Sequence, residues 1–315
     1  MSLPTHKDIT AVDPVLTNIL LGYKQDAGRF VADRVFPPVS VADKDGTYYI
    51  FDKKYWFTNQ AELRAPGTQF ARADFGATTS TYATLQYALS TPIADEIRAS
   101  NQAPMDLERA AVEFLAQKML LKREIDWATN FHKSGVWGTS GSVTAKFDAY
   151  STSDPVKDIQ AAVRTISNNT GMMPNTFVAG YIVQDRLVNH PDILDRIKYT
   201  TAAVMGNVEG ALASVFGLQN WWIGKAVYSN TNEASAFSST AILDDDLLVC
   251  YVNPNPGIFS ATAGLTFTWQ PGGGLGSADS YREENVKADV VRAWMQYDHV
   301  ALATDLGYFY ADCTD

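Results

Sequence analysis

The hydrophobic pattern is clearest between residues 106 and 131, where it predicts one long helix. Asp106 opens the segment, and Lys122 and Arg123 come later, an order of charges that suits the helix macrodipole. At 1.5 Å per residue the segment would span ~39 Å, a length that suits an elongated subunit. Its predicted apolar face consists of Leu107, Ala111, Phe114, Leu121, Ile125 and Ala128, widened by Leu115, Met119 and Leu120.

Residues 44–80 are predicted to form a long two-stranded excursion. A turn at 43–46 (DKDG) precedes an aromatic strand at 47–57, and a second turn at 65–68 leads to a polar return strand. Six of the ten residues from Tyr48 to Phe57 are aromatic. A lone ribbon is marginally stable in water, and such a surface invites aggregation unless it is covered. Cover from the chain's own core and cover from another molecule are both compatible with the pattern.

Residues 1 to about 40 lack a compact pattern and are predicted to form an arm. Leu16, Ile19 and Leu20 could share one helical face, and Pro37-Pro38 favours extended chain. The arm also carries apolar side chains that must be buried somewhere, namely Phe30, Val31, Val35 and Phe36.

From residue 150 to about 255, helical and strand patterns alternate, which predicts a compact α/β region. Asp154-Pro155 is a cap followed by proline at the first helical position. The last 55 residues are β-like again, apart from the glycine-rich stretch 271–277, which is interpreted as a flexible hairpin tip. Their strands can pair with residues 79–98, so that the α/β region would be inserted into a second domain.

Composition narrows the class of protein. Hydrophobic residues make up 46% and charged residues 19%, as in globular proteins. The formal net charge of -10 and the lack of basic runs argue against a protein that binds DNA tightly through its phosphates. No signal peptide or membrane segment is predicted. Cys250 lies within an apolar strand and Cys313 near the chain end, so a reducing compartment is favoured over a disulfide framework.

No catalytic, cofactor-binding or metal-binding residue is predicted. Asp244–Asp246 could bind a cation, but successive residues of an extended chain point to opposite sides, which favours a solvated turn. The same argument applies to Glu283-Glu284, and the glycine-rich stretch 271–277 lacks the Lys-Ser/Thr ending of a phosphate loop. The histidines are far apart and lack the spacing of metal ligands: His6, His132, His190 and His299.

Four segments in order carry a resemblance to a known family. The arm at 17–41, the aromatic strand at 47–57, the LRAPGT turn at 63–68 and the helix at 104–128 resemble the major capsid proteins of tailed bacteriophages. That family shares the Hong Kong 97 type fold, an α+β fold with an extended β-hairpin loop. The resemblance implies an N-terminal arm at 1–43, the extended loop at 44–80, a peripheral domain at 81–150 and 256–315 with a spine helix at about 105–132, and an α/β axial domain at 151–255.

The resemblance also implies function and partners. Copies of the chain would assemble into pentamers and hexamers of an icosahedral head that encloses double-stranded DNA, held only loosely and non-specifically. A separate scaffolding protein and a portal would take part in assembly in the host cytoplasm, with a decoration protein as a further candidate partner of the virion. No membrane partner and no crosslink is predicted. The expected contacts between subunits are Phe30, Phe36, Tyr49, Phe51, Lys54, Trp56 and Arg64.

Three rival functions remain. An encapsulin-type compartment has the same fold but surrounds an enzyme cargo. A tail or decoration subunit is disfavoured by the long helix and the two-domain pattern. An α/β enzyme is disfavoured because no nucleophile or metal motif is present.

Overall fold

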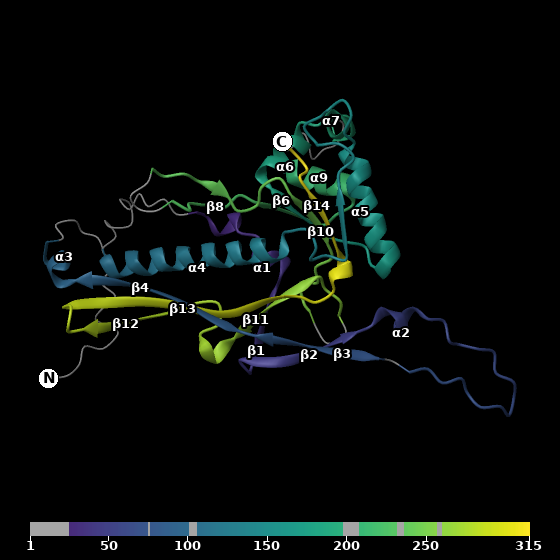
Figure 1. Ribbon diagram of the computed structural model, residues 1–315, viewed down its shortest axis with the longest axis horizontal. Coiled ribbons are helices and arrows are strands. Elements are labelled where there is room, and N and C mark those ends of the chain that lie inside the picture. Colours follow the sequence, from purple (N-terminus) through teal and green to yellow (C-terminus); the bar gives the residue numbers. More distant parts are fainter. Residues whose placement is uncertain (1–24, 75, 101–105, 198–207, 232–235, 257–259) are drawn as a thin grey trace.

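The computed structural model describes residues 25–74, 76–100, 106–197, 208–231, 236–256 and 260–315 of the 315-residue chain. The predicted arm helix around Leu16 to Leu20 lies outside them. The described chain is elongated, with two five-stranded sheets, a long helix and a projecting loop (Figure 1). Its short elements are η3 (Ala27–Arg29), α1 (Ala32–Val35), α3 (Asp95–Ser100), β8 (Val227–Tyr228), β9 (Thr240–Ala241), η4 (Gln270–Gly272) and η5 (Thr304–Leu306).

The first sheet is built around one long central strand. Its strands are β1 (Pro38–Val41), β4 (Leu85–Ala94), β11 (Gly264–Trp269), β12 (Ser277–Glu283) and β13 (Ala288–Ala301). β12 and β11 pair antiparallel with successive halves of β13, and β4 pairs with its other edge. The predicted pairing of residues 79–98 with the C-terminal strands is therefore confirmed for residues 85–94, whereas residues 79–83 pair within the loop. β1, from the predicted arm, adds to β11 in parallel.

The glycine-rich stretch is packed, which corrects the expectation of a flexible hairpin tip. It connects β11 and β12, which both pair with β13. The Gln296 backbone N–H donates to the Gly274 carbonyl over 2.7 Å, and Trp294 Nε1 donates to the Gly272 carbonyl over 3.0 Å. Gly273 and Gly274 have φ of 104° and 57°, the left-handed region that favours glycine.

The predicted long helix is confirmed as α4 (Leu107–Phe131), which lies along β4 and β13 (Figure 1). The Asp106 side chain caps it by accepting from the backbone N–H groups of Glu108 and Arg109. Of the predicted face, Ala111, Leu115, Met119 and Ala128 are buried, and the buried row continues at Arg123, Glu124 and Trp127, which were not predicted. Phe114, assigned to the buried face by the pattern, is 51% exposed.

The second sheet has the order β5-β14-β10-β6-β7. Its strands are β5 (Thr139–Ser142), β6 (Thr176–Gly180), β7 (Asn220–Gly224), β10 (Leu247–Cys250) and β14 (Gly307–Ala311), accompanied by α5 (Pro155–Thr170), α6 (Tyr181–Val188), α7 (Pro191–Ile197) and α9 (Val208–Phe216). The helices and strands predicted after residue 150 are confirmed, including the Asp154 cap of α5. One grouping is corrected: β5 and β14, predicted to belong with the first sheet, complete the second, because β14 pairs with β5 and β10.

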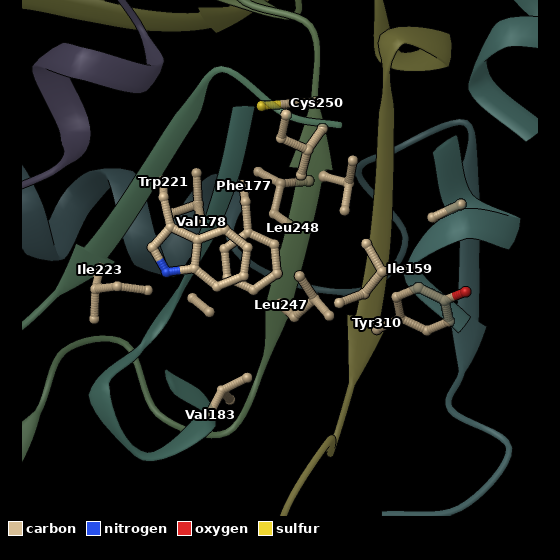
Figure 2. Close-up of a cluster of buried hydrophobic side chains, with 14 of the residues drawn as sticks. Ile159, Phe177, Val178, Val183, Trp221, Ile223, Leu247, Leu248, Cys250 and Tyr310 are labelled. Carbon is tan, nitrogen blue, oxygen red and sulfur yellow. The ribbon is translucent and has the colours of Figure 1, made fainter. Parts of the chain in front are cut away.

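The core of the second sheet is aromatic and aliphatic (Figure 2). Phe177 on β6 and Trp221 on β7 stack with ring centroids 3.7 Å apart, and Phe216 stacks on Trp221 from α9. Cys250 is fully buried, as predicted for a small apolar side chain, and both Cys250 and Cys313 are free thiols. Four of the five strands, β6, β7, β10 and β14, therefore contribute buried side chains to one core.

The projecting loop contains a ribbon of β2 (Asp45–Phe51) and β3 (Ala77–Ala83), paired from Asp45↔Ala83 to Phe51↔Ala77. The predicted two-stranded excursion is confirmed, although its first strand is shorter than expected. The strand ends at Phe51 because Asp52 caps a short helix, α2 (Lys53–Phe57), by accepting from the Lys54 backbone N–H over 2.9 Å. Beyond α2 the chain extends away from the body (Figure 1).

Candidate functional site

Among its described residues, the loop carries six large apolar side chains that are exposed. Tyr49 is 69% exposed and Trp56 is 59% exposed. Further large apolar side chains exposed on the loop are Tyr55, Phe57, Leu63 and Phe70. Large exposed aromatic surfaces of this kind are typical of sites that bind other macromolecules.

The tip of the loop has a local turn that orders one of these side chains. Arg64 Nε donates to the Thr68 carbonyl over 2.7 Å, and the Thr68 backbone N–H donates to the Ala65 carbonyl. The Arg64 guanidinium lies 4.3 Å from the centre of the Phe70 ring. A cation over an aromatic face holds both side chains in place at the tip.

The base of the loop is tied to the first sheet. Tyr82 stacks on Phe267 with ring centroids 4.5 Å apart, and the Lys44 carbonyl accepts from both the Thr84 backbone N–H and its hydroxyl. The Asp298 carboxylate accepts from the Ala83 backbone N–H over 2.9 Å. These contacts fix the direction in which the loop leaves the body.

A second tie joins the loop to the segment that precedes β14. Lys53 on α2 forms an ion pair with Asp305 on η5, and both side chains are about half exposed. The loop is thus held at its base and at α2, whereas the residues beyond α2 are exposed.

The structure brings five of the seven predicted contact residues together on this loop. Tyr49, Lys54, Trp56 and Arg64 are exposed, and Phe51 is partly buried with its ring perpendicular to that of Trp56. The other two residues, Phe30 and Phe36, lie elsewhere.

Phe30 and Phe36 are buried within the chain itself, which corrects the expectation that these arm residues need a neighbour to cover them. Phe36 is 0% exposed, and its ring centroid lies 4.9 Å from that of Phe131 and 6.0 Å from that of Trp127. The predicted arm is therefore partly a core segment, because the end of α4 supplies the apolar cover.

Some apolar residues are exposed although the sequence did not predict them to be. On the loop these are Leu63 and Phe70, and on α4 they are Val112 and Phe114. A stricter four-residue spacing from Ala111 through Leu115 would have placed Phe114 outside the buried face. No comparable local signal distinguishes Leu63 or Phe70.

Two histidines and the Asp244–Asp246 run were considered as candidate chemical groups, and each lies in a packed or hydrogen-bonded environment. Burial lowers the pKa of His132 and of His299 to about 4, and His299 Nδ1 lies 2.8 Å from the Thr266 hydroxyl. Within the described residues, no three His, Cys, Asp or Glu side chains are placed to hold a metal ion. Asp246 instead accepts from the Asp312 backbone N–H. Of the helices that the structure describes, none is long and apolar enough to cross a membrane.

Comparison with known proteins shows which proteins this chain is similar to. No family model matches the sequence. The chain is 29% identical over 228 residues to the major capsid protein of Burkholderia phage BcepMu, which covers 70% of this chain and 71% of that protein.

Solved structures extend the likeness to almost the whole chain. A phage-related protein from Bordetella bronchiseptica matches with a TM-score of 0.68 at 24% identity, over 96% of this chain and 97% of that one. The capsid of Myoviridae phage XM1 matches with a TM-score of 0.57 at 9% identity, over 98% of each chain. The predicted α+β fold of Hong Kong 97 type and the predicted resemblance to phage major capsid proteins are confirmed.

Proposed function

We propose that this chain, which has the Hong Kong 97 type fold, is the major capsid protein of a tailed phage and builds the head by self-association. The observation that carries the proposal is the combination of sequence likeness to a phage major capsid protein with a shared fold along almost the entire chain. The role is structural and needs no catalytic residue.

The parts of the molecule take corresponding roles in this proposal. The first sheet with α4 serves as the peripheral domain, with α4 as its spine helix. The second sheet with its helices serves as the axial domain, which meets its copies in pentamers and hexamers. The loop reaches over a neighbouring copy through Tyr49, Phe51, Lys54, Trp56 and Arg64, and its exposed aromatic side chains support this role.

Burial of the loop surface drives the association. Apolar area removed from water contributes ~25 cal/mol per Å² before the entropic costs of binding. The net charge of -10 lets the shell hold packaged DNA loosely and non-specifically. A scaffolding protein, a portal and a decoration protein are proposed partners, with assembly in the host cytoplasm and residence in the virion.

An encapsulin-type compartment is the alternative, and the comparisons do not favour it because the curated relative is a phage protein. Size-exclusion chromatography and negative-stain microscopy of the purified chain test the shared shell role. We expect hollow shells or rings, and a stable small monomer would contradict both. Particles purified from infected cells separate the two, because a phage head contains DNA and an encapsulin contains an enzyme.

The loop's part is tested by Trp56→Ala. Central aromatic residues commonly contribute ~2 kcal/mol or more to an interface, so we expect assembly to be lost at protein concentrations where the unmodified chain forms shells. Phe237→Ala is the matched control, since Phe237 is an exposed aromatic residue outside the loop. Assembly by the Trp56 variant at unchanged concentrations would exclude a central role for this side chain.

A further inference from the structure

A segment near the N-terminus, residues 25–36, bridges α4 and the second sheet, and we call it the strap. The Gln25 side chain donates to the Val227 carbonyl over 2.7 Å and accepts from the Val227 backbone N–H over 3.0 Å. The Lys225 backbone N–H donates to the Arg29 carbonyl, and the Arg34 guanidinium lies 4.6 Å from the centre of the Trp222 ring. One side of the strap is therefore attached at β7 and β8.

The other side of the strap is attached to α4 through a buried carboxyl group. Glu124 is 1% exposed, and its carboxyl oxygens accept from the backbone N–H of Val31 at 3.0 Å and of Ala32 at 2.9 Å. These N–H groups begin the four-residue helix α1, so they have no partner within the helix. Glu124 supplies the missing acceptor from a position 92 or 93 residues away in sequence.

Beside Glu124 lies an ion pair that is incompletely satisfied. Arg123, also buried, pairs through its guanidinium with Asp33 Oδ2 on α1. Asp33 Oδ1 is buried and has no hydrogen-bond partner. An ionised Asp33 therefore carries a buried lone pair without a donor, which is costly.

The charges in this cluster do not balance when both carboxyl groups are ionised. α1 contributes Asp33, while its Arg34 is directed to Trp222 on β7. α4 contributes Glu124 and Arg123, and on β13 the buried His299 lies close enough for the charge of Arg123 to lower its pKa. Two carboxylates share one guanidinium. The Asp33 side chain is 37% exposed and partly solvated, so the uncompensated negative charge falls on Glu124, which is 1% exposed, and one bound proton removes it.

We propose that Glu124, Asp33 and Arg123 form a proton-dependent latch for the strap. The docked strap holds one proton in the cluster, and release of that proton to solvent above neutral pH loosens residues 25–36 from α4. The latch rests on contacts within a single chain and does not depend on the proposed shell function.

The ionisation of the two carboxyl groups supports the latch. Burial is the largest cause that raises the pKa of Glu124 to about 7, and it outweighs the Val31 and Ala32 N–H donors, which favour the ionised form. Burial likewise raises the pKa of Asp33. Because the docked form has the higher pKa, it takes up a proton that the released form lacks between pH ~4.5 and ~7. The contribution of the latch is therefore fully present below ~4.5 and is lost as the pH rises through ~7.

Hydrogen exchange of the Val31 and Ala32 amides in the full-length chain tests the latch directly, because these amides donate to Glu124. After correction for intrinsic exchange rates, we expect their protection to fall about tenfold between pH 6 and pH 8. Glu124→Gln retains an acceptor oxygen but cannot ionise, so its protection should not vary with pH. A flat profile in the unmodified chain, or an unchanged pH dependence in the Gln variant, would overturn the proposal.

Two further variants keep the test decisive if Glu124→Gln does not fold. Asp33→Asn leaves one carboxylate opposite Arg123, so the cluster is neutral without a proton and the pH dependence should disappear. Glu209→Gln is the control, because Glu209 is an exposed partner of Lys225 beside the strap and outside the cluster. This control should keep the tenfold change, and its loss there would show that general electrostatics controls the strap.

Discussion

The extended loop and the second sheet are both rich in aromatic residues but use them oppositely. Trp221 in the second sheet is 5% exposed and stacks on Phe177. Trp56 in the loop is 59% exposed, with its ring perpendicular to that of Phe51. The sheet is covered by helices, whereas the ribbon projects from the body (Figure 1). Aromatic density therefore indicates that burial is needed, and only the surrounding elements determine whether the chain supplies it.

Among variants that compare the loop with the second sheet, Phe177→Ala is expected to lower the free energy of unfolding the most. Removing a fully buried ring stacked on Trp221 should lower the free energy of unfolding by ~3–5 kcal/mol, measured by urea denaturation. Trp56→Ala in the unassembled chain should change it by less than ~0.5 kcal/mol. Similar losses in the two variants would mean that the loop is part of the cooperative core.

Acid should destabilise the core through His132. Its pKa is about 4 in the folded chain because of burial, against ~6.5 when unfolded, so only the unfolded chain gains the proton as the pH falls from 7 to 5. We expect this group to account for a loss of ~2 kcal/mol, which His132→Gln should remove from the difference between urea titrations at the two pH values. The loop contains no histidine, so loop variants should retain the full acid sensitivity. An unaltered pH difference in the His132 variant would refute the assignment.

Two glycines with positive φ, one in the second-sheet domain and one in the loop, allow the same substitution to be compared in both regions. Gly171 ends α5 at φ 68°, where its N–H donates to the Ser167 carbonyl, and Gly67 lies in the loop turn at φ 85°. Gly171→Ala should cost ~1 kcal/mol in thermal unfolding, because an alanine at positive φ is strained. Gly67→Ala should change unfolding by less than ~0.5 kcal/mol, since its strain falls in an exposed turn. The reverse order would contradict the distinction between loop and core.

The smallest expected effect is that of Lys53→Met. It breaks the ion pair with Asp305 that joins the loop to the segment before β14. A half-exposed pair contributes ~0–1 kcal/mol, and salt screens it. We expect a small loss of stability at low salt that vanishes at high salt, compared by thermal unfolding. A loss that persists at high salt would point to packing of the lysine stem.

Local sequence signals predicted which segments form helices and strands. Pairing between distant segments decided which sheet each strand joins. Asp106 at the start and apolar residues at helical spacing marked α4, and Asp154-Pro155 marked the start of α5. The stretch that became β14 was predicted as strand, yet a five-residue apolar run suits either sheet. Its neighbours β5 and β10 lie far away in sequence, so no local pattern could assign it.

The candidate functional residues were likewise predictable only where the signal was local. Tyr49 and Trp56 were identified because a dense aromatic run in a two-stranded excursion lacks obvious cover. The same reasoning failed for Phe36, because its cover comes from Phe131 and Trp127 at the distant end of α4. The Glu124 cluster had no sequence signal, since a glutamate in an amphipathic helix ordinarily faces solvent.

The position of β14 has a consequence for synthesis of the protein. This strand forms from residues 307–311 yet lies inside its sheet, between β5 and β10. During translation the second sheet therefore has a missing strand until residues 307–311 have left the ribosome. A chain stalled or truncated before that point exposes open strand edges on β5 and β10, and we expect it to be retained by chaperones or degraded. Incomplete chains would thus be kept apart from the finished subunits.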